Sequence, residues 1–179
     1  MKLTLKSIVT FAALAVTVIA PTLLSASRAS ADPVKGTKAD YIGAGVSAGV
    51  TNGGSATGGD AATLGGNIQG RLTTQKAPVS VRGAVLFSDD TSAIMPIVTY
   101  DVPVAKNTNV YVGGGYSFVE KQGQATPLGN KNAPVVTVGA ESQIGKNLVI
   151  YGDTKWGVDA YQNSPADAVS FQAGAGFNF

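Results

Sequence analysis

The residue types that carry most enzyme chemistry are missing from this chain of 179 residues, which contains no Cys and no His. A disulfide framework, a thiol nucleophile, a Cys-bound metal, Ser-His-Asp catalysis and a His-ligated metal are therefore excluded. The Gly-rich runs around Gly53, Gly58 and Gly113 precede no helical pattern, so they do not predict phosphate-binding loops. We expect no enzyme activity, no cofactor and no metal site.

Six charged residues remain as candidates for chemistry, and their signs balance. They are Arg71, Arg82 and Lys155 against Asp101, Glu141 and Asp153. Two carboxylates at a fixed distance in a cleft can act as acid and base. Here the acids are better explained as partners of the three cations. We expect all six to form one polar network, provided that the chain folds so that they face one another.

The first 31 residues have the pattern of a cleavable signal peptide. Its basic start, apolar stretch and small-x-small cleavage motif are carried by Lys2 and Lys6, residues 8–20, and Ala29 and Ala31. A membrane helix is the competing interpretation, but the stretch is short for a bilayer core of about 30 Å, and Pro21 interrupts it. We therefore predict a signal peptide over residues 1–31 and export of the remainder.

Removal of this segment changes the net charge. The whole chain has 13 Lys and Arg against 11 Asp and Glu, a formal net charge of +2. Three of the basic residues, Lys2, Lys6 and Arg28, lie in the signal peptide, which leaves 10 basic against 11 acidic residues and a net charge of −1. No basic stripe remains, so no nucleic-acid partner is expected.

The rest of the chain reads as eight segments with period-two alternation, the pattern of a β-strand whose two faces differ. The segments cover residues 40–50, 63–74, 78–88, 92–102, 109–119, 134–144, 147–157 and 168–179. The fourth is the least regular, because Met95 and Ile97 fall on its polar face. Lengths of about 10–12 residues are long for a soluble sheet and suit tilted strands that cross a bilayer.

The connections between these segments differ in length. Short turns over residues 75–77, 103–108 and 145–146 alternate with long loops over residues 51–62, 120–133 and 158–167. One connection, residues 89–91, is shorter than this alternation predicts. Short turns on one side and long loops on the other are typical of bacterial outer-membrane barrels.

Aromatic residues indicate which face meets lipid. The apolar face carries Phe87, Phe118, Trp156 and Phe171 near the long loops, and Tyr100, Phe177 and Phe179 near the short turns. Two aromatic girdles are typical of the two membrane–water interfaces. A soluble barrel or sandwich, with the apolar face inside, is the alternative, but it would not need to sort aromatics to both ends. We predict that the polar face points inward.

These patterns predict an all-β fold, an eight-stranded antiparallel up-and-down transmembrane β-barrel over residues 40–179, after a short periplasmic segment over residues 32–39. The first strand must pair with the last, because open strand edges are not tolerated in hydrocarbon. Eight strands enclose a space that side chains nearly fill. Glycines of the first and eighth segments would leave room for long side chains from the others, so we expect a plugged interior and a monomer.

Two stretches resemble a known family. Residues 101–118, which contain Asp101-Val-Pro-Val and Tyr111-Val-Gly-Gly-Gly-Tyr-Ser-Phe118, are similar to the turn and strand of the small eight-stranded outer-membrane barrels of the OmpX and OmpA membrane-domain type. Phe177 and Phe179 close the last segment and resemble the signal that the barrel-assembly machinery recognises. The resemblance implies a Gram-negative outer-membrane location, periplasmic short turns, outward loops, lipopolysaccharide as a neighbour, and periplasmic chaperones during biogenesis.

Two functions stay open at this point. One is a structural or surface-interaction barrel with a closed interior, and the other is a narrow porin-like channel for ions or small solutes. Enzymes among such barrels rely on a catalytic His, which is absent here. The predicted outer connections are acidic, which indicates either a solvated rim or divalent-cation bridges to lipopolysaccharide. Their acids are Asp60, Asp89, Asp90, Glu120, Asp159 and Asp167.

Overall fold

The computed structural model describes residues 35–53, 63–74 and 76–179. The predicted signal peptide, with its cleavage residues Ala29 and Ala31, lies outside the described residues, as does Asp60. The chain divides after Val34, and the unit considered below is Lys35–Phe179. Within the described ranges, no helix is long and apolar enough to cross a membrane.

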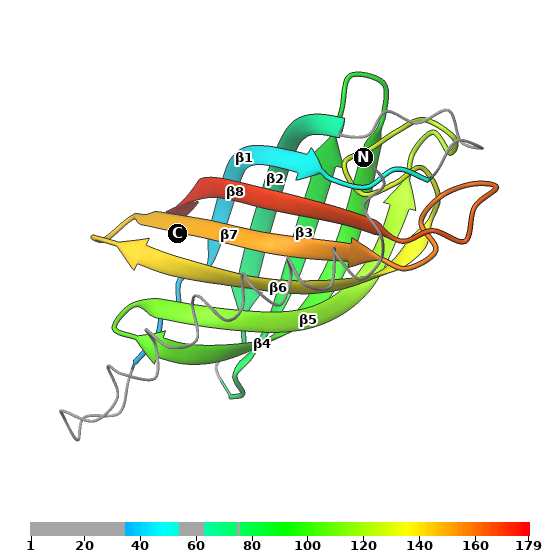
Figure 1. Cartoon of the computed structure of the whole chain (residues 1–179). Coiled ribbons are helices and arrows are strands. Elements are labelled where there is room, and N and C mark those ends of the chain that lie inside the picture. Colours follow the sequence, from blue (N-terminus) through cyan, green and yellow to red (C-terminus); the bar gives the residue numbers. More distant parts are fainter. Residues whose placement is uncertain (1–34, 54–62, 75) are drawn as a thin grey trace. The chain divides into compact units, whose positions relative to one another are not determined.

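Eight β-strands follow one another along this unit (Figure 1). They are β1 (Tyr41–Gly49), β2 (Thr63–Thr73), β3 (Val79–Phe87), β4 (Ser92–Ala105), β5 (Thr108–Val119), β6 (Ala133–Ile144), β7 (Leu148–Gly157) and β8 (Ala168–Asn178). Each strand pairs antiparallel with its neighbours in the sequence. Most bounds agree with the sequence prediction to within one residue, because the alternation ends where turn-forming residues begin.

The barrel closes through β1, which pairs with β2 on one side and with β8 on the other. Tyr41 lies opposite Arg71 and Asn178, and Gly49 lies opposite Thr63 and Ser170. No strand edge is therefore left open in this sheet. The prediction of a closed eight-stranded antiparallel barrel is confirmed.

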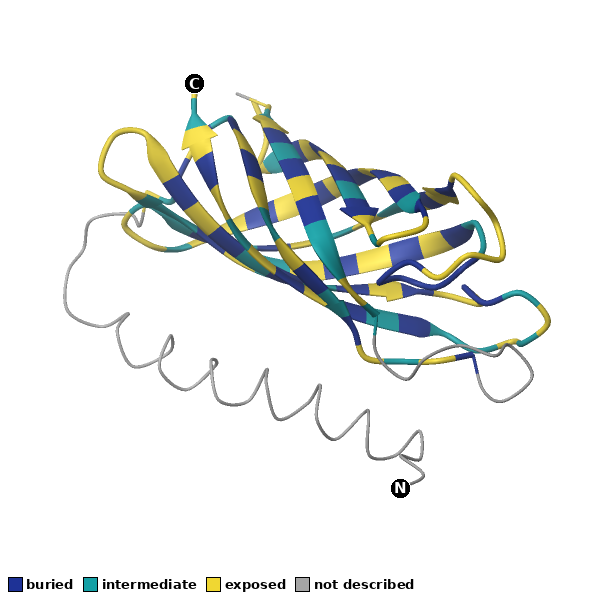
Figure 2. Ribbon diagram, turned by 90° about the horizontal axis from the view of Figure 1, so that it is seen from above, coloured by how far each residue is buried: buried dark blue, intermediate teal, exposed yellow. Residues whose placement is uncertain are grey.

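Buried and exposed residues alternate along the strands and form bands across the sheet (Figure 2). In β1, Ile42 and Val46 are 58% and 69% exposed, whereas Tyr41 and Ser47 are 1% and 2% exposed. Over most of the sheet the large apolar side chains thus face outward and the polar ones inward, which inverts the usual order of a soluble protein.

The hairpin between β4 and β5 is tighter than the sequence predicted. We predicted a connection over residues 103–108, but β4 continues to Ala105 and β5 begins at Thr108. The register shifts between Pro103 and Ala105, and Asn107 has a φ of 62°, a left-handed conformation that Asn tolerates. The prediction was wrong because Pro103 breaks the alternation without ending the strand.

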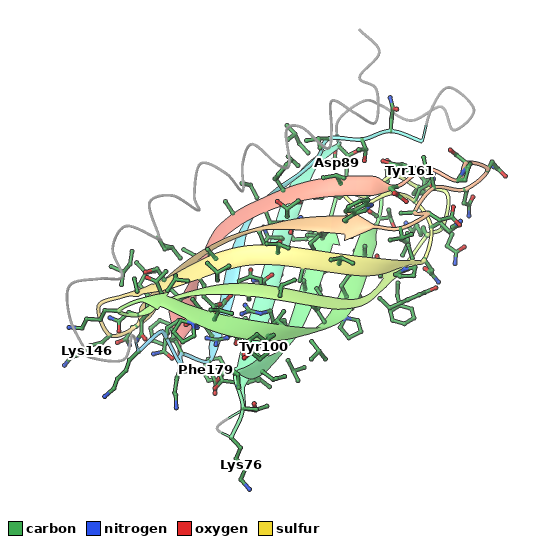
Figure 3. The ribbon with its side chains drawn as sticks, turned by 60° about the horizontal axis from the view of Figure 1, so that its bottom comes forward. Lys76, Asp89, Tyr100, Lys146, Tyr161 and Phe179 are labelled. Atoms are coloured by element: carbon green, nitrogen blue, oxygen red, sulfur yellow. The ribbon has the colours of Figure 1, made fainter. Side chains whose placement is uncertain are left out.

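The long and short connections lie at opposite ends of the barrel. Figure 3 shows Asp89 and Tyr161 at one end, and Lys76, Lys146 and Phe179 toward the other. We call these the long-loop end and the short-turn end. The long-loop end carries residues 120–132 and 158–167, and the loop after β1 is described only as far as residue 53.

Candidate functional site

Four charged side chains from four strands meet inside the barrel. Arg71 comes from β2, Arg82 from β3, Asp101 from β4 and Glu141 from β6, and all four are buried. Each lies on the inward face of its strand, as the period-two pattern predicted. The antiparallel register places Arg71 beside Arg82, so two cations lie next to each other and need anions from across the barrel.

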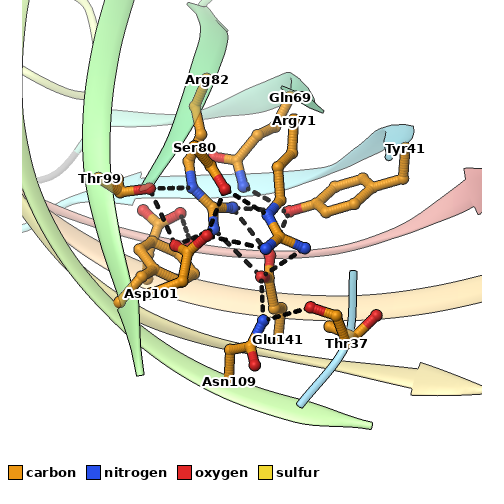
Figure 4. Close-up of polar contacts among 12 residues, drawn as sticks. Thr37, Tyr41, Gln69, Arg71, Ser80, Arg82, Thr99, Asp101, Asn109 and Glu141 are labelled. Carbon is orange, nitrogen blue, oxygen red and sulfur yellow. Dashed lines mark hydrogen bonds and ion pairs between the residues drawn. The ribbon is translucent and has the colours of Figure 1, made fainter. Parts of the chain in front are cut away.

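Both arginines bridge both carboxylates (Figure 4). The Arg71 guanidinium lies 2.8 Å from Asp101 Oδ2 and 3.0 Å from Glu141 Oε1. The Arg82 guanidinium lies 3.1 Å from Asp101 Oδ1 and 2.8 Å from Glu141 Oε2. A planar guanidinium suits such forked contacts, and an ammonium does not. The network of two cations and two anions is electrically neutral.

Hydroxyl groups complete the surroundings of Asp101. Arg82 Nε donates to Thr99 Oγ1 at 3.0 Å, and Thr99 Oγ1 donates to Asp101 Oδ1 at 3.0 Å. Arg71 Nε donates to Ser80 Oγ at 3.1 Å, and Ser80 Oγ donates to Asp101. Buried charges are tolerated when their remaining hydrogen-bonding capacity is filled in this way.

Two tyrosine side chains contact Glu141 and Arg82. Tyr41 OH donates to Glu141 Oε2 at 3.2 Å and accepts from Gln69 Nε2 at 3.1 Å. The guanidinium carbon of Arg82 lies 3.7 Å from the centroid of the Tyr111 ring, a cation–π contact.

The remaining two charges form a separate pair. Lys155 Nζ lies 2.6 Å from Asp153 Oδ1, and Tyr111 OH donates to Asp153 Oδ2 at 2.9 Å. Lys155 Nζ also contacts Gln69 Oε1 at 3.4 Å. The six charges thus form two ion-pair groups, one of four and one of two, and hydrogen bonds through Gln69 and Tyr41 connect the two groups. All six charged side chains are buried.

Glycines of β1 and β8 lie directly against the rings of Tyr41 and Tyr151. A Cβ atom at Gly43 would lie 2.8 Å from Tyr151 Cε1, and one at Gly174 would lie 2.4 Å from Tyr151 OH. A Cβ atom at Gly176 would lie 2.8 Å from Tyr41 Cδ2, and the Tyr41 and Tyr151 rings stack with centroids 5.7 Å apart. The glycines of β1 and β8 therefore make room for side chains that cross the interior.

Residues 35–40 close the short-turn end of the barrel. The sequence did not assign this segment to the interior. Thr37 and Ala39, in residues 35–40, are buried. Asn109 Nδ2 donates to the Thr37 carbonyl at 2.7 Å, and Arg71 Nη1 donates to the Ala39 carbonyl at 3.0 Å. These contacts use backbone carbonyls, so no side-chain pattern marks them in the sequence.

Toward the long-loop end part of the interior is apolar. Leu86, Met95, Ile97 and Val135 line it, and Leu128 enters from the loop that follows β5. Met95 and Ile97 made the fourth segment irregular in the sequence. The structure explains them, because the inward face of β4 is polar only near the short turns.

All seven predicted girdle residues lie on the outer surface, with exposed fractions between 40% for Phe87 and 70% for Phe179. Phe87, Phe118, Trp156 and Phe171 lie in the parts of their strands nearer the long loops, and Tyr100, Phe177 and Phe179 lie nearer the short turns. Sequence reasoning left Tyr116 out of this set. Its ring packs beside Phe118, with centroids 5.0 Å apart.

The described acids of the long-loop end do not gather around a common point. In the described part of the chain, no group of three or more His, Cys, Asp or Glu could hold a metal ion. Asp159 instead pairs with Lys131 at 3.0 Å near the surface. The interior ion pairs of Arg71 and Arg82 link β2, β3, β4 and β6.

No family model matches the chain, and no curated protein matches its sequence. Among solved structures, it is similar to the N-terminal β-barrel domain of Pseudomonas aeruginosa OprF, with a TM-score of 0.52 and 13% identity over 81% of this chain and 100% of that chain. The structure of Ail, the attachment invasion locus protein of Yersinia pestis, gives a TM-score of 0.51 and 15% identity, over 80% of this chain and 100% of that chain. The structure of neisserial surface protein A gives a TM-score of 0.57 and 15% identity, over 78% of this chain and 97% of that chain. The predicted resemblance to the small eight-stranded outer-membrane barrels is thus confirmed at the level of the fold.

Proposed function

We propose that the chain is a bacterial outer-membrane β-barrel protein with a structural or surface-interaction role and a polar, largely plugged interior. The observation that carries this proposal is the inverted wall. Leu64 and Val46 are 78% and 69% exposed, whereas Arg82 and Lys155 are among the largest fully buried side chains. Such an apolar outer surface is costly in water and is covered favourably by hydrocarbon.

The orientation follows from the two unlike ends. The long loops face outward beside lipopolysaccharide, and the short turns, with Lys76, Lys106 and Lys146, face the periplasm. Residues 1–31 are removed after Ala31 on export. Phe177 and Phe179 form the signal for the barrel-assembly machinery, and periplasmic chaperones deliver the chain to it. Ail and neisserial surface protein A are named for attachment and for the surface, which supports a role at the cell surface.

Fractionation tests the location. A Gram-negative host that expresses the full chain should carry it in the outer-membrane fraction. The unheated protein should migrate differently on a gel from the boiled protein, because a closed barrel resists unfolding by detergent. Soluble protein in the periplasm, with no such difference in migration, would contradict the proposal.

Electrical recording tests the closed interior against the alternative of a narrow porin-like channel. The ion-pair network, residues 35–40 and Leu128 together support a closed lumen. Wild-type protein in a planar bilayer should show no steady conductance, and Arg82→Ala should open a conducting path. Steady conductance of the wild type would favour the channel.

A further inference from the structure

Charged residues are divided unevenly between the two ends of the barrel. The short-turn end carries five exposed lysines, which are Lys35, Lys38, Lys76, Lys106 and Lys146. Outside the interior ion pairs, the described Asp and Glu residues lie at the long-loop end, except for Asp40, whose Oδ1 accepts from Thr73 N at 2.7 Å. The five cations outnumber Asp40 and the terminal carboxylate of Phe179. The short-turn end is therefore positively charged and attracts anions.

The outer wall has a hollow beside this end. Gly70 of β2 and Gly83 of β3 lie opposite each other on the outward face, where neither residue has a side chain, and a Cβ atom at Gly83 would meet nothing within 4 Å. The hollow has a volume of about 270 Å³. Its walls include exposed apolar side chains, those of Ile42, Leu72, Val81 and Phe179. We call these six residues and the space between them the outer groove.

The outer groove starts at the turn between β2 and β3. Leu72 and Val81 lie opposite each other at the short-turn end of these strands, and Gly70 and Gly83 follow two residues further into the wall. Lys76 lies in the turn itself and is exposed (Figure 3). A cation thus lies beside the start of an apolar groove, and a ligand reaches both from the outside of the barrel.

The groove and the lysine together match one kind of molecule. The wall side chains are hydrocarbon, so the groove takes an apolar chain, which regains the van der Waals contacts that an empty hollow would lose. A lysine ammonium binds a phosphate group as a point charge, and its long stem reaches the headgroup level of a membrane from an adjacent turn. A hydrocarbon chain with a phosphate group at one end satisfies both features.

We propose that the outer groove and Lys76 bind one anionic phospholipid of the leaflet at the short-turn end. One acyl chain lies along the groove over Gly83 and Gly70, and the phosphate group lies beside the Lys76 ammonium. A phospholipid with a choline headgroup binds less well, because its own cation meets the other lysines of this end. This inference rests on the proposed membrane location and names a lipid partner for the wall.

A second copy of the chain fits the groove less well than a lipid does. Two barrels inserted from the same side of a membrane have the same orientation, so contact through the groove would bring their short-turn ends side by side. The exposed lysines of the two copies would then repel one another. An anionic lipid instead neutralises part of this charge.

Native mass spectrometry of the full chain tests the proposal. The folded barrel in detergent is mixed with equal amounts of phosphatidylglycerol and phosphatidylcholine and is released from the micelle in the spectrometer. A shift in gel migration on heating shows for each sample that the barrel has formed. The wild type should be a monomer that retains one phosphatidylglycerol, with a preference of about fivefold over phosphatidylcholine, as expected for one lysine at a membrane surface.

Two pairs of variants assign the bound lipid to the groove. Gly83→Leu fills the groove and should lose the lipid. Gly114→Leu adds the same side chain to the outer face of β5, where a Cβ atom would lie 3.4 Å from the Val135 carbonyl oxygen, and should keep the lipid. Lys76→Gln should lower the preference for phosphatidylglycerol about fivefold. Lys106→Gln, in the turn between β4 and β5, should leave it unchanged.

Equal retention of the two lipids by the wild type, or retention of neither, would overturn the proposal. Equal behaviour of Gly83→Leu and Gly114→Leu, or of Lys76→Gln and Lys106→Gln, would also overturn it, and a lipid-free dimer would show that a second copy covers the groove. All these results leave the proposed function intact while the barrel still shifts on heating, whereas a wild type without that shift contradicts the proposed function itself. Lys76 is exposed, so its variant decides the question if Gly83→Leu does not fold.

Discussion

Arg82 holds more of the interior together than any other side chain of the four-charge network. Its guanidinium contacts Glu141 twice, at 2.8 and 3.1 Å, and Asp101 once, at 3.1 Å. It also donates to Thr99 Oγ1 and lies over the Tyr111 ring. Removal of this one cation leaves two buried carboxylates with a single arginine between them.

Arg82→Ala is therefore expected to lower the free energy of unfolding by about 3–5 kcal/mol, the usual cost when one partner of a buried ion pair is removed. Urea unfolding from lipid vesicles measures it. Lys131→Ala is the matched control, since the pair between Lys131 and Asp159 is partly exposed and should contribute about 0–1 kcal/mol. Equal losses in the two variants would contradict a structural role for the network.

Tyr161 ties the last loop to the end of β1. Its hydroxyl donates to the Thr51 carbonyl at 2.6 Å and lies 3.1 Å from Thr51 Oγ1. Burial raises the pKa of Tyr161 above its ordinary value of 10.0, and the hydrogen bond with Thr51 acts in the opposite direction. The neutral phenol is thus the form that the folded loop favours.

This raised pKa predicts a dependence on pH. The contribution of Tyr161 to stability is fully present below pH 10 and is lost as the pH rises through the folded pKa. Absorbance of tyrosinate, recorded for the wild type minus Tyr161→Phe, should titrate with a midpoint above 10. A midpoint at or below 10 would show that this hydroxyl is not buried in the loop.

At the scale of elements, the strands could be predicted from the sequence, but several contacts inside the barrel could not. Period-two alternation identified all eight strands and their inward faces, because the outward face of each strand is mostly apolar and the inward face mostly polar. It did not predict that residues 35–40 enter the barrel, since the segment has no alternating pattern and is held by the Thr37 and Ala39 carbonyls and by one hydrogen bond from Thr37 Oγ1 to Gln143. It also did not predict how the six interior charges divide into ion pairs, because alternation fixes a face but gives no distance across the lumen.

The glycines of β1 provide a test at this scale. A Cβ atom at Gly45 would lie 2.0 Å from the Ala173 carbonyl oxygen, and the backbone of β8 cannot give way easily. A Cβ atom at Gly83, on the outer face of β3, would meet nothing within 4 Å. Gly45→Ala should therefore destabilise the barrel by about 1–3 kcal/mol.

Gly83→Ala is the matched control for Gly45→Ala. It should be neutral or should stabilise by up to about 1 kcal/mol, since alanine restricts the unfolded chain more than glycine does. Urea unfolding from vesicles measures both. A loss in Gly83→Ala as large as in Gly45→Ala would show that close packing of β1 against β8 does not set the requirement for glycine.

The whole molecule has an apolar outer wall, a lumen crossed by buried ion pairs, and side chains or backbone segments at both ends. Arg71, Arg82, Asp101 and Glu141 cancel in charge, as do Lys155 and Asp153, so these described charges of the lumen give no excess of either sign. A sign-selective pore would need such an excess. The wall and the lumen together favour a barrel that is embedded in lipid and closed.

Trp156 tests the central claim, that the outer wall meets hydrocarbon. The chain has one tryptophan, and Trp156 is 47% exposed on the outer face of β7. Its fluorescence is recorded with the protein in phosphatidylcholine vesicles whose acyl chains carry bromine at different depths. We predict emission at short wavelength and strong quenching by bromine near the headgroup end of the chains. Emission typical of water, unchanged by bromine at every depth, would contradict it.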